Sequence, residues 1–231
     1  MYKANRCAMK NRTTRRLQYY IPIAAVLMVS ALAASAAAGS SAYAFMSTVS
    51  GHATPRLAAT AGSGNGRYVV QKAVTDKRLW NGIFDADELR TRVHNPEGVA
   101  TAESWSDDIE IHLQDGRKLS TDAIKARIAA DGSSSVYLED TKLTLDGHEY
   151  AQSEVDLSPA PNTALRELLH VDAQLLRNAG ISGVAHEKGD HFINVLRITL
   201  DDFVPNDGSE PLSGDLIFSH VQIEPATGPG H

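Results

Sequence analysis

The sequence predicts a single α+β domain in which an antiparallel or mixed sheet carries about three helices on one face. Three observations support this fold class. Segments of alternating polarity, such as Asp108–Gln114, are typical of half-buried strands. Asp-Gly pairs between such segments indicate hairpin turns. A leucine-rich stretch with a 3.6-residue period, Asn162–Gly180, predicts one long amphipathic helix.

The N-terminus has the layout of an export signal. An uncharged apolar stretch, Ile21–Ala38, follows a segment with several Lys and Arg residues and no acid. The small residues of Ala42-x-Ala44 come next and predict cleavage before Phe45. The apolar run approaches the about 20 residues that cross a bilayer, which leaves a retained N-terminal anchor as the alternative. We therefore expect a signal peptide or membrane anchor over 1–44.

The segment after the signal is expected to be a linker. Phe45–Gly66 is almost uncharged and has no apolar period, which is typical of flexible chain. Arg67–Val74 is rich in β-branched residues and predicts a first strand. A short helix is expected to begin at Asp85, with Glu88 completing a capping box, and to end before Pro96.

A second helix is expected after the hairpin turn at Asp115-Gly116. Ser120 can cap it, and Gly132 can end it. Ile124 and Ile128 are four residues apart and would form its apolar side.

Several short strands complete the expected domain. Asp146-Gly147 is a second hairpin signal. The exported domain should span 67–225, followed by a disordered tail over 226–231. The further strands are expected at 136–138, 142–145, 148–151, 191–204 and 214–224.

The composition limits both compartment and partners. The chain has a formal net charge of −6, and loss of the basic N-terminus would leave the exported part more acidic. An acidic domain has no bulk attraction for nucleic acid or for an anionic membrane surface. The single cysteine, Cys7, lies in the basic segment, so no disulfide, catalytic thiol or Cys-based metal site is expected in the exported domain. The expected location is the periplasm or cell envelope, with an inner-membrane anchor if the signal stays uncleaved.

Asp172 is the candidate catalytic residue. In the expected long helix it falls in the middle of the leucine face, where an unpaired carboxylate is costly. We expect either a structural partner, such as Arg197 or a backbone amide, or an active-site acid at this position. If the carboxylate is buried and partnered, Asp172→Asn should lower stability.

His186, Asp190 and His191 are the candidate metal ligands. Imidazole and carboxylate together suit zinc or copper. The two histidines are five residues apart with Gly189 between them, which excludes a zinc-protease helix. A polar turn is the alternative. No phosphate loop, dinucleotide fingerprint or serine-nucleophile motif is present in the sequence, and no cofactor is predicted.

Two fragments, Asp115–Ser120 and Leu175–Ser182, resemble parts of the periplasmic domains of TolR-type biopolymer-transport proteins. That family carries an aspartate in its membrane helix for proton coupling, whereas Ile21–Ala38 contains no acid. The resemblance therefore implies a similar packing of helices on a sheet, and the function of the family is not carried over.

The sequence predicts an exported, acidic, non-enzymatic domain that binds an unidentified partner, either another envelope protein or a small ligand. One alternative is an extracytoplasmic hydrolase with dispersed active-site residues, with or without a metal. Another is an accessory subunit of an envelope complex that an uncleaved anchor keeps at the membrane. Binding of nucleic acid is not expected, and membrane contact is expected only through an uncleaved N-terminal segment.

Overall fold

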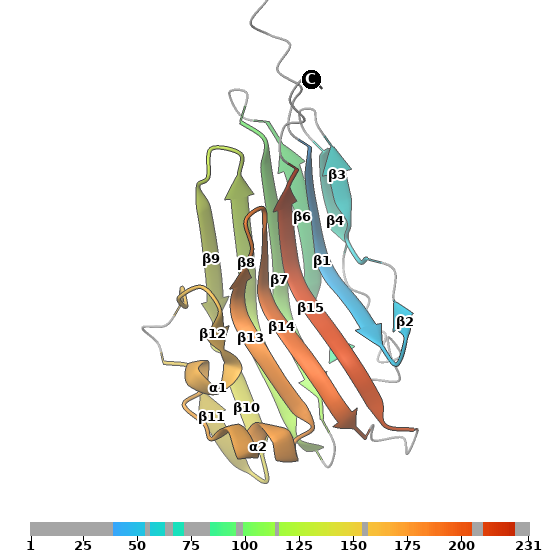
Figure 1. Ribbon diagram of the computed structural model, residues 1–231, viewed down its shortest axis with the longest axis vertical. Coiled ribbons are helices and arrows are strands. Elements are labelled where there is room, and N and C mark those ends of the chain that lie inside the picture. Colours follow the sequence, from blue (N-terminus) through green and yellow to red (C-terminus); the bar gives the residue numbers. More distant parts are fainter. Residues whose placement is uncertain are drawn as a thin grey trace, which may run out of the picture. The chain divides into compact units, whose positions relative to one another are not determined.

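The structure, a computed structural model, describes residues 39–53, 56–62, 67–71, 84–95, 99–113, 116–153, 157–204 and 210–224. All of these residues belong to one compact unit, Ala36–His231. The described residues form mostly antiparallel strands in two sheets, with two short helices (Figure 1). The prediction of an α+β domain with about three helices packed on a sheet is therefore wrong, because the helices cover only a small part of the chain.

The first sheet has seven strands, and all of its pairings are antiparallel. Its central strands are long, so they pair over most of their length. In spatial order the strands are β12 (Thr163–Ala164), β13 (Ile181–Lys188), β14 (Phe192–Phe203), β15 (Leu212–Ile223), β1 (Ser40–Val49) and β2 (His52–Ala53), with β3 (Thr60–Gly62) also paired to β1.

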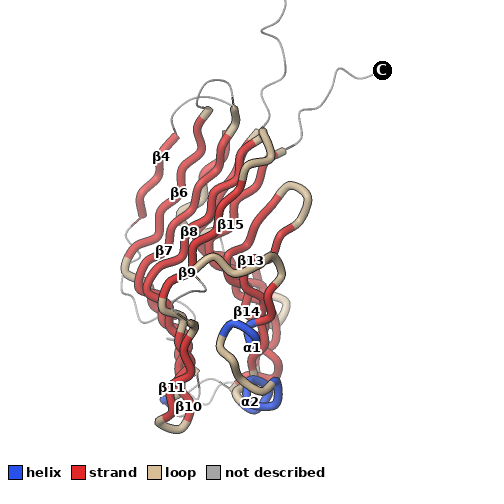
Figure 2. The backbone as a smooth tube through the Cα atoms, turned by 90° about the vertical axis from the view of Figure 1, so that its left-hand side faces the viewer, coloured by secondary structure: helices blue, strands red, loops and turns tan. Residues whose placement is uncertain are grey.

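The second sheet has eight strands, also antiparallel throughout. It faces the first sheet across the core (Figure 2). In spatial order its strands are β11 (His148–Ala151), β10 (Lys142–Leu145), β8 (Lys118–Ala129), β7 (Thr101–His112), β6 (Glu88–His94) and β4 (Arg67–Gln71), with β5 (Phe84–Asp85) paired to β7 and β9 (Ser134–Glu139) paired to β8.

The two helices are short. Helix α1 spans Leu165–Leu168, and α2 spans Ala173–Asn178. Both pack against β13, and Leu165, Leu168 and Leu176 are buried. In the described part of the chain, no helix is long and apolar enough to cross a membrane.

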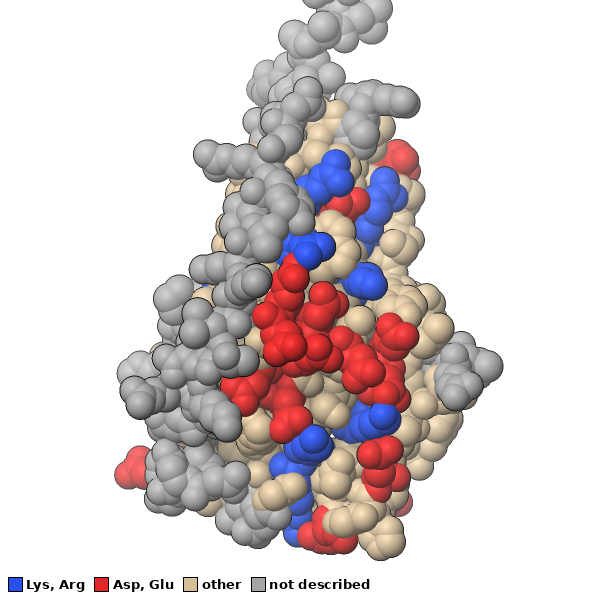
Figure 3. Space-filling view, turned by 180° about the vertical axis from the view of Figure 1, so that it is seen from behind, with Lys and Arg blue, Asp and Glu red and all other residues tan. Residues whose placement is uncertain are grey.

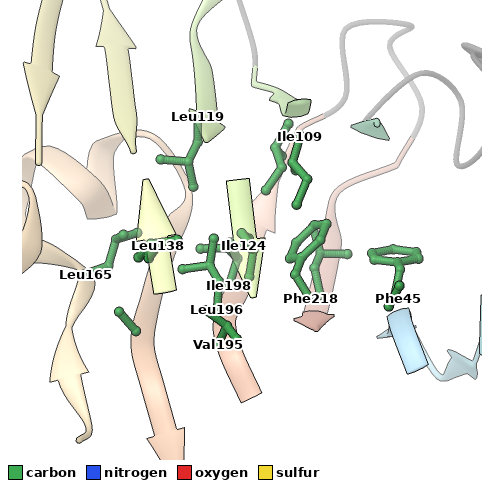
Figure 4. Packing of buried hydrophobic residues seen from close by; sticks show 14 of the residues in the cluster. Phe45, Ile109, Leu119, Ile124, Leu138, Leu165, Val195, Leu196, Ile198 and Phe218 are labelled. Carbon is green, nitrogen blue, oxygen red and sulfur yellow. The ribbon is translucent and has the colours of Figure 1, made fainter. Parts of the chain in front are cut away.

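The inner faces of the two sheets share one apolar core (Figure 4). Phe45 of β1 stacks on Phe84 of β5 with ring centres 4.5 Å apart, and Phe218 of β15 lies 5.1 Å from Phe45. Burial of such side chains contributes about 1.5–3 kcal/mol each to folding. These three rings hold the two sheets together without any disulfide.

Buried hydroxyl groups also connect the sheets. Ser104 and Ser106 of β7 donate hydrogen bonds to the backbone carbonyls of Tyr43 and Ala44, at 3.3 and 3.4 Å. The hydroxyl of Ser106 also lies 3.0 Å from that of Ser219. A buried carbonyl without a partner is costly, so these small polar residues stabilise an irregular part of β1 inside the core.

Each sheet has a line of positions at which the alternation of inward and outward side chains is reset, as at β-bulges. In the seven-stranded sheet, Ser219 and His186 have positive φ angles of 53° and 52°. Such angles are uncommon for residues other than glycine. Four neighbouring residues of this sheet have no directly opposite partner in the strand pairing: Ala44, Ser219, Val195 and His186.

In the eight-stranded sheet this line consists of aspartates. Asp108 and Asp140 have positive φ angles of 49° and 52°, which aspartate tolerates better than most residues. The register passes over Asp108 and Asp122, and two more aspartates adjoin them at the ends of neighbouring pairings. We call this set the aspartate row: Asp87, Asp108, Asp122 and Asp140.

The expected helices are corrected as follows. The segment beginning at Asp85 forms strands β5 and β6, and the segment after Ser120 continues as β8. The long helix expected over 162–180 is divided into α1 and α2, because the chain turns at His170, where φ is 53°. Leucine periodicity was present in both helices but did not reveal the break.

The expected linker is also corrected. The range 45–66 includes the second half of β1 and all of β2 and β3. Phe45 is buried, and its carbonyl accepts a hydrogen bond from Leu57 N at 2.8 Å. Small uncharged side chains, which indicated flexible chain, instead fit between closely packed sheets.

Most expected strands are confirmed. They correspond to β4, β7, β9, β10, β11, β14 and β15. The hairpin at Asp146-Gly147 joins β10 to β11, with positive φ angles of 51° and 81° at the two turn residues. Residues 1–38, Asp115 and the tail 226–231 lie outside the described residues.

Candidate functional site

The outer face of the eight-stranded sheet carries a row of alternating cationic and aromatic side chains. Along β6, β7, β8 and β9, side chains alternate between the core and the outside. The strand register places one outward residue from each strand directly opposite the next. We call these residues the cation–aromatic row: Arg90, Trp105, Lys125 and Tyr137.

Each cation in this row faces an aromatic ring. The guanidinium carbon of Arg90 lies 6.0 Å from the Trp105 ring centre, and Lys125 Nζ lies 5.0 Å from that of Tyr137. Such contacts contribute about 0.5–1 kcal/mol at exposed sites. Lys125 is exposed, and no carboxylate among the described residues lies within ion-pair distance of it. Its charge is therefore accessible to a partner.

The next row of outward residues is rich in arginine. Glu103 lies between Arg92 and Arg127, with nitrogen–oxygen distances of 3.7 and 3.6 Å. The Glu103 side chain is only 14% exposed, so its carboxylate is well placed to orient both guanidinium groups. One carboxylate does not neutralise two arginines, and this part of the face therefore keeps a positive charge.

A shallow groove of about 410 Å³ lies on this part of the face. Trp105, Lys125 and Tyr137 of the cation–aromatic row line it, together with Glu103 and Arg127. Figure 3 shows this side of the molecule, with Lys and Arg side chains above and below a central band of Asp and Glu.

The acidic band adjoins the cation–aromatic row. It contains Glu88, Asp107 and Glu139, which share one level of the register, and the aspartate row beyond them. Glu88 forms an ion pair with Arg90 and so links the two zones. Partial desolvation raises the pKa of Asp108, and the neighbouring Asp87 and Asp122 raise it further. The face thus presents zones of opposite charge side by side.

The outer face of the seven-stranded sheet is different. Tyr43 of β1 stacks on His220 of β15 with ring centres 4.3 Å apart and planes 9° from parallel. His220 Nδ1 lies 2.6 Å from Asn194 Oδ1, and the Asn194 amide donates to Glu187 at 2.6 Å. Burial lowers the pKa of His220 to about 4, against a smaller raising effect of its hydrogen bond to Gln222. His220 is therefore neutral at physiological pH.

The same network continues through Arg197. Its guanidinium donates to Glu187 at 2.9 Å and to Asp215 at 2.8 Å. Asp215 also accepts a hydrogen bond from Thr199 at 2.7 Å. Burial alone would raise the pKa of Asp215, but the hydrogen bonds from Arg197 and Thr199 lower it overall. The charged groups of this face therefore bind mainly to one another, through hydrogen bonds and ion pairs.

Asp172 is exposed and does not lie in a leucine face. It is the N-cap of α2, and its carboxylate accepts a hydrogen bond from Gln174 N at 2.6 Å. The expected partner Arg197 is occupied by Glu187 and Asp215 instead. A backbone amide was one of the structural partners expected for Asp172, and it is the partner found. The contact lies at the surface and not in a buried leucine face.

His186, Asp190 and His191 are not assembled into a metal site. In the described part of the chain, no group of three His, Cys, Asp or Glu side chains could hold a metal ion. His186 lies in β13, and its Nδ1 is 2.8 Å from the carbonyl of Pro159. Asp190 and His191 are exposed in the turn to β14, where the His191 carbonyl accepts from Ile223 N.

Sequence reasoning did not single out Trp105, Lys125 or Tyr137. Each lies in an alternating segment, so its outward direction was open to prediction once β7, β8 and β9 were recognised as strands. Their alignment depends on the register between strands far apart in sequence. The pairing of these strands shifts at the aspartate row, and no local pattern in the sequence specifies that shift.

The fragments that resembled TolR-type proteins do not form a common helix–sheet unit in this fold. The last three residues of Asp115–Ser120 are the start of strand β8, and Leu175–Ser182 spans the end of α2 and the start of β13. Comparisons with protein-family models, with curated proteins and with solved structures found no match to this chain.

Proposed function

We propose that this chain is an extracytoplasmic, non-enzymatic domain that binds another protein of the cell envelope through the cation–aromatic row. The observation that carries the proposal is the alignment of Arg90, Trp105, Lys125 and Tyr137 across four strands of one exposed sheet face. The export signal in the sequence supports the location.

The residue types favour recognition of a protein. Trp, Tyr and Arg are the residues that most often dominate binding energy at protein interfaces. The groove they line is shallow and lies on a broad sheet face. A partner needs to contact a wide area to gain affinity on such a surface, which suits a folded protein better than a small ligand.

The charges specify what the partner should present. The positive zone around Lys125 and Arg127 requires acidic groups, and the acidic band around Asp107 requires basic groups. Opposite zones on one face fix the orientation of a partner, because any rotated arrangement brings like charges together.

The contacts of the cationic groups also favour binding over a purely structural role. Ion pairs at exposed positions contribute about 0–1 kcal/mol to stability. The pairs around Glu103 are long, and Lys125 faces the Tyr137 ring and forms no ion pair with a described residue. These groups therefore lose little when they reorganise to meet a partner.

The experiment compares partner binding by the full chain and by surface variants. Partners are isolated from envelope extracts with the wild type, with Trp105→Ala and with Lys125→Glu, and the affinity of the recovered partner is measured for each. We expect each substitution to weaken binding by about 2 kcal/mol, which is roughly 30-fold in Kd. Binding should also weaken with increasing salt.

Two variants elsewhere on the surface serve as controls. Tyr150→Ala removes a partly buried aromatic side chain from β11, and Lys188→Glu reverses an exposed charge on β13. Both should bind like the wild type. Thermal unfolding shows whether each variant remains folded. Equal binding by all four variants, or specific recovery of a small molecule instead of a protein, would contradict the proposal.

A further inference from the structure

The position of β1 limits where an export signal can be removed. Cleavage before Phe45 would divide this strand near its middle. Ala42, Tyr43 and Ala44, on the side that would be lost, are 2%, 4% and 0% exposed. They belong to the folded core and not to a segment that precedes it.

The part of β1 before Phe45 makes many contacts. Ser40–Tyr43 pairs with β15, and Ser40–Ala42 also pairs with β3. The carbonyls of Tyr43 and Ala44 accept the hydrogen bonds of Ser104 and Ser106 from the opposite sheet. Removal of this segment would leave those hydroxyls without these acceptors and expose His220, on which Tyr43 stacks. Loss of buried contacts on this scale destabilises a domain severely.

We infer that the signal is removed between Ala38 and Gly39. Ala36-x-Ala38 offers the same pair of small residues as Ala42-x-Ala44, directly at the end of the apolar stretch. The carbonyl of Gly39 accepts a hydrogen bond from Glu224 N at 2.7 Å, next to the first paired residue of β1. Cleavage at this bond leaves every contact of β1 in place.

The surroundings of Gly39 fit a new N-terminus. A Cβ atom at this position would lie 2.5 Å from Glu224 Oε2, so the carboxylate is immediately beside the glycine. Peptide hydrolysis by a signal peptidase consumes one water, leaves a carboxylate on Ala38 and releases Gly39 with a protonated amino group. Glu224 then provides a negative charge next to that group. Cleavage after later small-residue pairs, such as Ser40-x-Ala42, would again cut into β1. Earlier pairs, such as Ser35-x-Ala37, lie within the apolar stretch itself, and cleavage after Ala37-x-Gly39 would remove the carbonyl that Glu224 N binds.

The inference rests on the proposed extracytoplasmic location, and the experiment separates the two. The full chain is produced in a bacterial host, cells are fractionated, and the N-terminus of the envelope form is determined by sequencing and intact mass. We expect Gly39 as the first residue. Envelope protein that begins at Phe45, at any other residue or at Met1 overturns the inference. Recovery of only full-length chain in the cytoplasm overturns the proposed location as well.

Two substitutions in the full chain test the position directly. Ala38→Leu places a large residue directly before the bond and should abolish the form that begins at Gly39. Ala33→Leu is the matched control within the apolar stretch and should leave processing unchanged. Normal processing of Ala38→Leu at Gly39, or at Phe45, contradicts the inference.

Discussion

The outer faces of the two sheets use polar residues in opposite ways. On the seven-stranded sheet, Arg197 is held by Glu187 and Asp215, and His220 is covered by Tyr43 and bound to Asn194. On the eight-stranded sheet, Lys125 faces the Tyr137 ring, and Arg92 and Arg127 share the single carboxylate of Glu103.

This difference separates a face that stabilises the fold from a face that is available for recognition. Groups that are already hydrogen-bonded in a partly buried network must lose those bonds before they can bind anything else. Groups held by exposed ion pairs and cation–ring contacts lose little. Substitutions on the first face should therefore change stability, and equivalent substitutions on the second should change binding.

The largest stability effect should come from His220. Its folded pKa of about 4 lies below the ordinary value of 6.5. The unfolded chain therefore takes up a proton between pH 6.5 and 4 that the folded chain excludes. The neutral ring contributes its full stability above pH 6.5, and roughly 3 kcal/mol is lost as the pH falls to 4.

Denaturant unfolding across this pH range measures the effect. His220→Gln removes the titrating group and keeps hydrogen-bonding capacity toward Asn194, so its stability should fall less steeply with decreasing pH. Other carboxylates titrate in both proteins, which makes the difference between the two curves the informative quantity. Identical slopes would mean that His220 is not protected from protonation.

A smaller effect is expected from matched neutralisation of one carboxylate on each face. Asp215→Asn leaves Arg197 and Thr199 with a weaker acceptor and should lower the free energy of unfolding by about 1–3 kcal/mol. Glu103→Gln breaks two long ion pairs and should change it by less than about 1 kcal/mol.

Binding should respond in the reverse order. Glu103→Gln increases the positive charge next to Lys125 and should strengthen binding of a partner with acidic groups, whereas Asp215→Asn should not affect it. Titration of the same partner with both variants checks this. If Asp215→Asn weakened binding while Glu103→Gln had no effect, the assignment of the two faces would be reversed.

The smallest effect concerns Asp172. Because it is an exposed N-cap, Asp172→Asn should change stability by only a few tenths of a kcal/mol, since asparagine caps helices about as well as aspartate. Asp172→Ala should cost about 0.5–2 kcal/mol. A buried and partnered Asp172 would instead make Asp172→Asn clearly destabilising. Melting temperatures of the two variants distinguish the alternatives.

Much of the strand content was predictable from alternation, but several strands had features that also fit a helix. Ile124 and Ile128 are four residues apart, which places them on one side of a strand as well as of a helix. In β6 the inward positions include Thr91, which is buried and donates to the carbonyl of Ala58. A polar residue in an inward position hid the alternation with Leu89 and Val93.

The site was less predictable than the fold. Asp172 and His186 were candidates because carboxylates and imidazoles can act in catalysis or bind metals. In the structure, Asp172 caps a short helix and His186 lies at a bulge in β13. The residues of the cation–aromatic row extend from Arg90 in β6 to Tyr137 in β9, and only the strand register brings them side by side. Long-range register depends on packing of the whole sandwich and is not encoded in any local motif.

Site-specific photo-crosslinking from the two faces tests the central claim most directly. A photoreactive residue replaces Lys125 on the eight-stranded sheet or Thr199 on the seven-stranded sheet of the full chain, and envelopes are irradiated. We expect one discrete protein adduct from position 125, its loss when Trp105→Ala is added, and no adduct from position 199. An adduct from position 199 alone, or one from position 125 that persists with Trp105→Ala, would contradict the assignment of the cation–aromatic row as the binding surface.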